Sequence, residues 1–229
     1  MDTLERIIRA RPPTVLRPCA FFIAWSGVPT LAYQGFSPPL LGIKASLEAH
    51  DSDLADENPG SRWPKTTLGA LRDGHVLRWR EAVALRQACD ALNHRLRTAP
   101  DRLCVRALTV VRSRCKSLER RRYSLSVPLM HPEPPPTHAP PAPHRRSVER
   151  TLQQFDRQNL WAYWKAHLRD GARESHYRAL HVESTLVIDV RHQLPILNAF
   201  VDRVESVLPG RYVWFSPSSR HVTLRTLRR

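Results

Sequence analysis

Cysteine is scarce in this chain, and its few copies are not spaced for metal binding. The four are Cys19, Cys89, Cys104 and Cys115, with no Cys-x-x-Cys pair and no nearby histidine at metal-ligand spacing. This argues against a zinc knuckle and against a disulfide scaffold. Free thiols fit a reducing compartment and are usually buried. We expect no metal and no other cofactor.

Long apolar runs are also absent. The longest, around Cys19 to Trp25, is far shorter than the ~20 residues that a membrane span needs. The N-terminus carries several arginines, but Asp2 and Glu5 do not fit a transit peptide, and no signal-peptide core follows. These absences predict an intracellular protein without a membrane partner, cytoplasmic or nuclear, with an organelle as the open alternative.

Acidic residues are few. The chain has 36 Lys+Arg against 21 Asp+Glu, a net charge of +15 and a pI near 10.9. Between Arg102 and Arg122 there are eight basic residues and one acid, Glu119. Such an excess favours a polyanionic partner, which could be nucleic acid, a phosphate-bearing ligand or an anionic membrane surface. Of these we expect RNA or a phosphorylated nucleotide. An arginine-rich proteome is the alternative explanation.

Proline, by contrast, is concentrated in one place. Residues 128–144 hold eight prolines in seventeen positions, which predicts an extended linker. A ligand for a proline-recognising domain is the less favoured functional alternative. The expected divisions are a loosely held N-terminal extension (1–18), a first lobe (19–127), a proline-rich linker (128–146), a helix (147–171) and a second unit (172–229).

Hydrophobic periodicity predicts the main elements. Apolar spacing indicates a helix from about Arg80 to Arg97 and another that begins at Ser147. Alternating residues indicate a β-hairpin over 102–113 and 122–129 with arginines on its open side. A strand is expected from His181 to Val190.

The C-terminal stretch His221-Val222-Thr223-Leu224-Arg225 alternates polar and apolar residues. In a β-strand this pattern places His221, Thr223 and Arg225 on one face and the two apolar residues on the other. An imidazole and a hydroxyl would then share a face.

A similar stretch occurs early in the chain, at Lys65-Thr66-Thr67-Leu68. Laid over the C-terminal stretch, it matches Thr67 with Thr223 and puts Lys65 where His221 stands. Upstream, Thr30-Leu31 precedes Lys65 by 35 residues, and Thr185-Leu186 precedes His221 by 36. Both segments then run through a proline and a helical apolar pattern, which predicts an internal duplication.

This arrangement resembles the two-histidine (2H) phosphoesterase superfamily, which includes bacterial 2′-5′ RNA ligase/cyclic phosphodiesterases. The likeness covers residues 19–127 and 180–229, and the matching motif is His221-Val222-Thr223-Leu224. It implies an α+β, bilobal fold in which duplicated strand-helix-strand units form two antiparallel sheets around a central cleft. Each lobe would contribute one histidine and one hydroxyl.

The resemblance implies hydrolysis of a phosphodiester such as a 2′,3′-cyclic phosphate at an RNA end, with His221 as catalytic acid or base. Lys65 departs from the family pattern, because a protonated lysine can bind phosphate but is a poor base. The expected phosphate-binding residues are Lys65, Thr67, Thr223 and Arg225. The expected base-stacking residues are Trp63, Tyr212 and Trp214.

The sequence also allows two other functional hypotheses. The chain could bind RNA ends or nucleotides through the same cleft without catalysis. It could also be a basic structural or interaction protein in which the cleft is vestigial. For the threonines and aromatic residues, strand propensity and packing are sufficient explanations.

Overall fold

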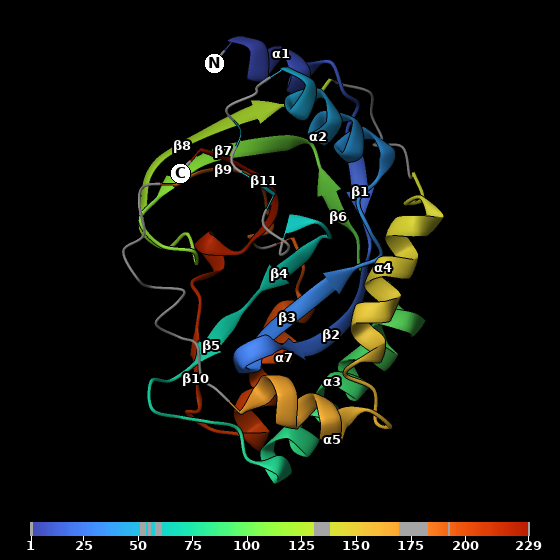
Figure 1. Ribbon diagram of the computed structural model, residues 1–229, viewed down its shortest axis with the longest axis vertical. Coiled ribbons are helices and arrows are strands. Elements are labelled where there is room, and N and C mark those ends of the chain that lie inside the picture. Colours follow the sequence, from blue (N-terminus) through green and yellow to red (C-terminus); the bar gives the residue numbers. More distant parts are fainter. Residues whose placement is uncertain are drawn as a thin grey trace.

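A computed structural model describes residues 2–50, 54, 56–57, 61–130, 138–169, 183–191 and 193–228. It is a mixed α+β structure with several antiparallel sheets (Figure 1). The helices are α1 (Asp2–Arg9), α2 (Pro38–His50), α3 (Trp79–Thr98), α4 (Ala142–Gln153), α5 (Leu160–Tyr163) and α7 (Ile196–Val207), with a π-helix, η3 (Trp164–Leu168), directly after α5.

The strands form two larger sheets and two short pairs. The four-stranded sheet has the order β11-β9-β7-β8, the three-stranded sheet has the order β2-β3-β4, and β1 pairs with β6 and β5 with β10. The strands are β1 (Thr14–Leu16), β2 (Pro18–Ala24), β3 (Val28–Tyr33), β4 (Lys65–Thr67), β5 (Gly69–Leu71), β6 (Leu103–Val105), β7 (Ala107–Ser113), β8 (Arg121–Pro128), β9 (Glu183–Asp189), β10 (Tyr212–Trp214) and β11 (His221–Arg228).

Several predicted elements are confirmed. The apolar stripe expected over 80–97 is α3, and its Leu85, Cys89 and Leu92 are buried. The predicted hairpin is β7 paired antiparallel with β8. The strand expected at 181–190 is β9. These elements could be predicted because each follows a local period of 3.6 or 2 residues.

The two connecting helices pack against sheets to which their own flanking strands do not belong. Helix α2 connects β3 to β4 of the three-stranded sheet, yet it contacts β11 and α1, which in turn contacts β8. Helix α7 follows β9 of the four-stranded sheet, yet Phe200 on α7 stacks on Phe21 of β2. In Figure 1, α2 accordingly lies at the top beside β7 and β8, and α7 lies lower, near β2 and α3. This exchange ties the two sheets together.

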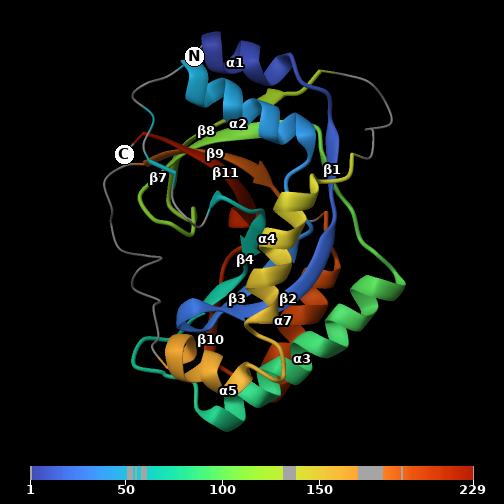
Figure 2. The same cartoon turned by 45° about the vertical axis from the view of Figure 1, so that its right-hand side comes forward.

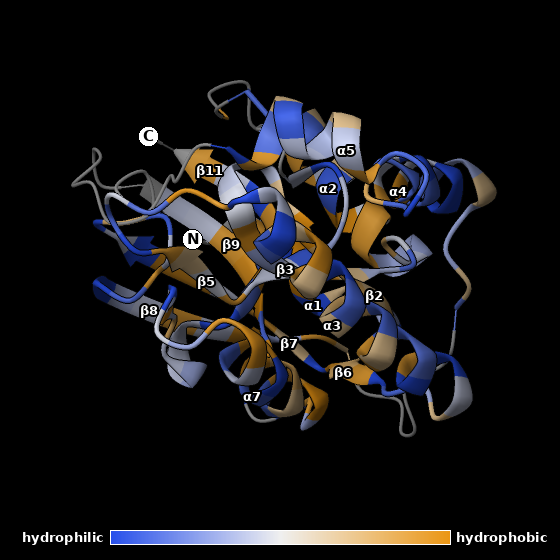
Figure 3. Ribbon diagram, turned by 90° about the horizontal axis from the view of Figure 1, so that it is seen from below, coloured by the Kyte–Doolittle hydropathy of each residue, from blue (hydrophilic) through white to orange (hydrophobic). Residues whose placement is uncertain are grey.

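One contiguous apolar cluster includes residues of both sheets and of α2, α3 and α7. The helices carry hydrophilic and hydrophobic residues side by side (Figure 3), as expected for helices that bury one side. Among the described residues, no helix combines the length and the apolar character needed to cross a membrane.

The N-terminal segment is more firmly held than its sequence predicts. Ile8 on α1 and Leu16 on β1 are fully buried, and Val15 pairs with Cys104 of β6. The expectation of a loosely held extension at residues 1–18 is therefore wrong. Ile7, Ile8 and Leu16 belong to the main apolar cluster, which a short segment interrupted by two prolines does not reveal.

The helix expected from Ser147 begins earlier and ends sooner. Helix α4 starts at Ala142, because a proline is compatible with a first helical turn, and it ends at Gln153. The chain then turns and continues as α5 and the π-helix. Figure 2 shows α4 in front of β2 and β3. Residues 131–137 of the expected linker, the end of the expected helix (170–171) and the start of the expected second unit (172–182) lie outside the described residues.

Candidate phosphate site on two neighbouring strands

The two sequence motifs, Lys65-Thr66-Thr67 and His221-Val222-Thr223, lie on two strands with the same pattern of burial. On β4, Lys65 and Thr67 are half-buried and Thr66 between them is buried. On β11, His221 and Thr223 are half-buried and Val222 is buried. Each strand therefore turns its charged or imidazole side chain and its threonine toward the same side, as the alternation predicts.

Pairing between β5 and β10 brings the two motifs near one another. Strand β5 follows the first motif and β10 precedes the second, and Gly69 pairs with Trp214. Beyond this pair, the backbone N–H of Phe215 donates a hydrogen bond to the carbonyl of Leu68 at 2.8 Å. Strands β4 and β11 consequently have Cα atoms within 8 Å of each other, although they do not pair.

The His221 ring is held in one tautomer. Its Nδ1 lies 2.7 Å from the carbonyl oxygen of Ser219, and a carbonyl can only accept, so Nδ1 carries the proton. Burial lowers the pKa of His221 to about 4; the Ser219 carbonyl opposes this shift, Arg121 adds to it, and Asp189 opposes it. At pH 7 the ring is therefore neutral, and Nε2 keeps a lone pair that can accept a proton.

An acidic residue that the sequence did not single out lies directly opposite His221. Asp189 is the β9 partner of His221 in the strand register. Its carboxylate accepts hydrogen bonds from the Thr109 hydroxyl at 2.8 Å and from Arg121 Nη2 at 3.1 Å. The position of Asp189 at the end of a largely apolar strand could have marked it in the sequence as a candidate site residue. Arg121 could not be found this way, because it comes from the hairpin.

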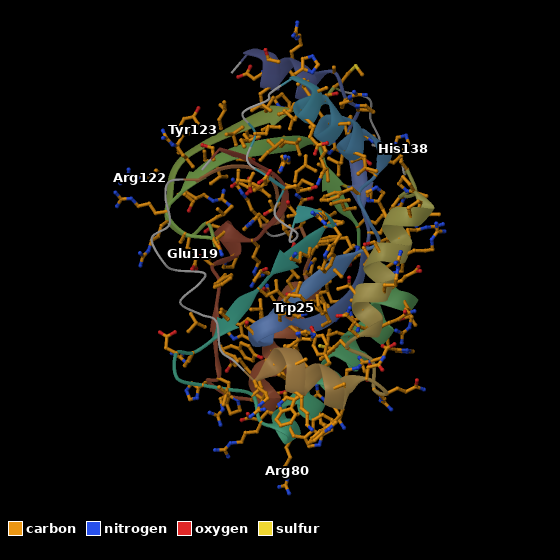
Figure 4. All side chains as sticks on the ribbon, viewed as in Figure 1. Trp25, Arg80, Glu119, Arg122, Tyr123 and His138 are labelled. Atoms are coloured by element: carbon orange, nitrogen blue, oxygen red, sulfur yellow. The ribbon has the colours of Figure 1, made fainter. Side chains whose placement is uncertain are left out.

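The turn between β7 and β8 supports the segment that leads to His221. Leu118, with a φ of 58°, packs with Val111 and Val187 on the His221 side of the four-stranded sheet. The neighbouring Glu119 accepts a hydrogen bond from the backbone N–H of Ser216 at 2.8 Å. In Figure 4, Glu119 lies at this turn, while Arg122 and Tyr123 point outward from β8. The turn thus fixes the backbone just ahead of the histidine.

Lys65 sits beside an aromatic ring. Its ammonium nitrogen lies 4.6 Å from the centre of the Trp63 ring, a cation–π geometry. Burial lowers the pKa of Lys65 from 10.5 to about 8. Lys65 is thus mostly protonated at pH 7, but it releases its proton more readily than an exposed lysine does. Trp63 also packs against Phe22, with ring centres 5.9 Å apart.

Arg225 does not share the face of His221, so the alternation expected there is wrong. A β-bulge interrupts β11: Thr223 pairs with Val187, but Arg225 pairs with Leu186 on the core side. Arg225 is only 5 % exposed, and Nε lies 3.8 Å from a Glu48 carboxylate oxygen on α2. The extra residue at Leu224 causes this reversal.

The expected base-stacking residues also differ in accessibility. Tyr212 is 2 % exposed and its ring is covered, so it is not accessible to a nucleic-acid base. Trp214 is half-buried, and its indole N–H donates to a Glu205 carboxylate oxygen at 2.7 Å. Trp63 is half-buried and borders Lys65. The burial of Tyr212 arises from its packing between β5 and α3 residues of the core, which strand propensity alone does not decide.

The structure describes free cysteines at all four positions, and Cys89 and Cys115 are buried. Among the described residues, no group of three or more His, Cys, Asp or Glu side chains is arranged to hold a metal ion.

No protein-family model, no curated protein and no solved structure matches this chain.

Proposed function

We propose that this protein recognises phosphate esters at RNA ends and hydrolyses 2′,3′-cyclic phosphates, in a divergent 2H-like site formed by β4 and β11. The proposal rests mainly on one observation: burial keeps the His221 ring neutral, and the Ser219 carbonyl holds its proton on Nδ1, so Nε2 is left as an acceptor. A half-buried lysine and two threonines on the neighbouring strands complete a set suited to a phosphoryl group.

In the proposed reaction, Nε2 of His221 takes a proton from water as its oxygen attacks phosphorus. The bond from phosphorus to one ribose oxygen breaks, and that oxygen takes a proton from the Lys65 ammonium. The product is a ribose phosphomonoester with one free hydroxyl. A proton then returns from His221 to Lys65 through solvent. The Thr67 and Thr223 hydroxyls donate hydrogen bonds to the non-bridging oxygens as charge develops there.

We further propose that the chain is bilobal and duplicated, with β3-α2-β4 and β9-α7-β11 as related units. Supporting this, each unit pairs its two strands antiparallel and places its helix on the other sheet. The registers differ by two residues, because Thr67 pairs with Thr30 whereas Thr223 pairs with Val187. An even offset keeps the side chains on the same face.

Turnover of an oligonucleotide that ends in a 2′,3′-cyclic phosphate tests the proposal. Wild type should open the cyclic phosphate, and His221→Ala should lower kcat by about 100-fold or more, as expected for loss of a general base. His94→Ala, an exposed histidine on α3, is the matched control and should keep full activity.

The same experiment separates catalysis from binding. Absence of turnover, with binding of the cyclic-phosphate end that depends on Lys65 and His221, would replace hydrolysis by recognition alone. Absence of both would leave the structural or interaction protein. Turnover that is equal in His221→Ala and wild type would place the chemistry elsewhere.

A further inference from the structure

A pocket lies away from β4 and β11, between α4 and the α5-π-helix segment. Its volume is about 560 Å³, within the range of small-molecule sites. The residues that give it chemical character come from both helical segments and from the β2-β3 turn: they are Trp25, Arg150, Gln153, Gln154, Asn159 and His167.

Trp25 is the most unusual residue of this pocket. It is 64 % exposed, although an exposed indole leaves a large apolar surface in water. One face of its ring stacks on His167, with ring centres 4.8 Å apart and planes 11° apart. The following residue, Ser26, has a φ of 61°, a conformation that non-glycine residues rarely adopt. Figure 4 shows Trp25 at this turn, in front of the strands.

His167, which supports Trp25, is itself firmly placed. It lies in the π-helix Trp164–Leu168, a rare helical form that is frequent at functional sites. Tyr163 packs edge-on against His167 with ring centres 5.0 Å apart. The Tyr163 hydroxyl donates to the carbonyl of Ile23 on β2 at 2.9 Å, which ties the helix to the sheet below the turn. The indole is therefore presented on a rigid support, and among the described residues its one ring contact is with His167.

The remaining lining side chains suit a nucleobase and its phosphate. Three amides, from Gln153, Gln154 and Asn159, offer donors and acceptors for the edge of a base. Arg150 contributes a positive charge, and none of the described residues that line the pocket is acidic. In a chain with a net charge of +15, this combination favours a polyanion over a peptide.

We propose that this pocket binds one base of single-stranded RNA, stacked on the face of Trp25 away from His167, with Arg150 beside the adjoining phosphate. The site is separate from the proposed phosphoester site, since no residue of β4 or β11 lines it. It holds the body of an RNA strand and does not require a cyclic phosphate at the end.

The test compares two 10-mers that carry the same number of phosphates and end in a 3′-hydroxyl: oligoadenylate and an abasic ribose-phosphate chain. Dissociation constants are measured by fluorescence anisotropy. Wild type should bind oligoadenylate more tightly, and Trp25→Ala should weaken this binding about 5- to 100-fold, the range expected for one stacked base. The abasic chain should bind both proteins equally.

Control variants show whether a loss of oligoadenylate affinity in Trp25→Ala is specific to the Trp25 ring. Tyr123→Ala removes another exposed aromatic ring, on β8, and should leave the preference for oligoadenylate intact. Trp25→Phe should retain part of it, and Lys65→Ala should not change it, so that failure of the phosphoester site would not be confused with failure of this one. Thermal unfolding of each variant checks that the fold is retained.

Equal binding of both 10-mers by wild type, or an unchanged preference in Trp25→Ala, would overturn the proposal. A synthetic peptide of residues 131–141 covers the other ligand class. Binding of that peptide in a Trp25-dependent manner, with no preference for oligoadenylate, would make the pocket a proline-motif site and would equally overturn it.

Discussion

Phe21 on β2 and Phe200 on α7 stack face to face, with ring centres 4.2 Å apart and planes 6° apart. This contact holds the helix that follows β9 against a sheet to which β9 does not belong. In the other half of this exchange, α2 lies beside β11, where a Glu48 carboxylate oxygen is 3.8 Å from Nε of Arg225.

Phe200→Ala should lower the free energy of unfolding by about 3–5 kcal/mol, because it opens a cavity in a fully buried position. Chemical denaturation gives the value. Asp202→Ala, exposed on the same helix, should change it by no more than about 0.5 kcal/mol. A loss below about 1 kcal/mol in Phe200→Ala would mean that this stack does not anchor α7.

Burial of His221 makes stability depend on pH. The folded-state pKa of about 4 lies below the unfolded value near 6.5, so between these values the unfolded chain binds more protons. The stabilisation is present above pH 6.5 and is lost as pH falls toward 4, by up to about 3 kcal/mol. His221→Asn, which keeps a donor for the Ser219 carbonyl, should flatten this part of the curve. If the free energy of unfolding falls equally steeply between pH 6.5 and 4 in wild type and in His221→Asn, His221 is not the cause of the pH dependence.

Asp189 should set part of the pKa of His221, since its carboxylate raises that pKa while Arg121 lowers it. Asp189→Asn should therefore lower the pKa of His221 further and leave Arg121 without its ion-pair partner. Titration of the histidine resonances by NMR measures the shift. Asp202→Asn, on α7, serves as control. A rise in the pKa would show that Arg121 moves away when Asp189 is neutral.

If Lys65 donates the proton to the leaving oxygen, turnover should fall as pH rises through about 8, where Lys65 loses its charge. Lys65→Arg keeps the charge but cannot release a proton near neutral pH. It should retain binding of the cyclic-phosphate end and lower kcat by about 100-fold or more. Full activity in Lys65→Arg would mean that Lys65 only binds phosphate and does not donate the proton.

Arg225→Met tests the consequence of the bulge. Because Arg225 points to the core side, the substitution should leave binding of the cyclic-phosphate end within about twofold of wild type. Its Nε and Nη1 have no hydrogen-bond partner among the described residues. Replacement by an apolar side chain of similar length should therefore be neutral or stabilising, by about 1–4 kcal/mol at most. A selective loss of binding of the cyclic-phosphate end in Arg225→Met would mean that Arg225 contributes to the phosphate site.

The sequence alone determined the elements whose residues repeat with a local period. The apolar stripe of α3, the alternating hairpin of β7 and β8, and the faces of Lys65-Thr66-Thr67 and His221-Val222-Thr223 follow from spacing along one helix or strand.

Only the tertiary structure decided which side chains meet. A single bulge at Leu224 reversed Arg225, and burial against the core removed Tyr212 from reach. The pairing of Asp189 with Arg121, and the stacking of Trp25 on His167, join residues 68 and 142 positions apart. Such contacts depend on how sheets and helices pack in three dimensions, and no local period along the chain records them.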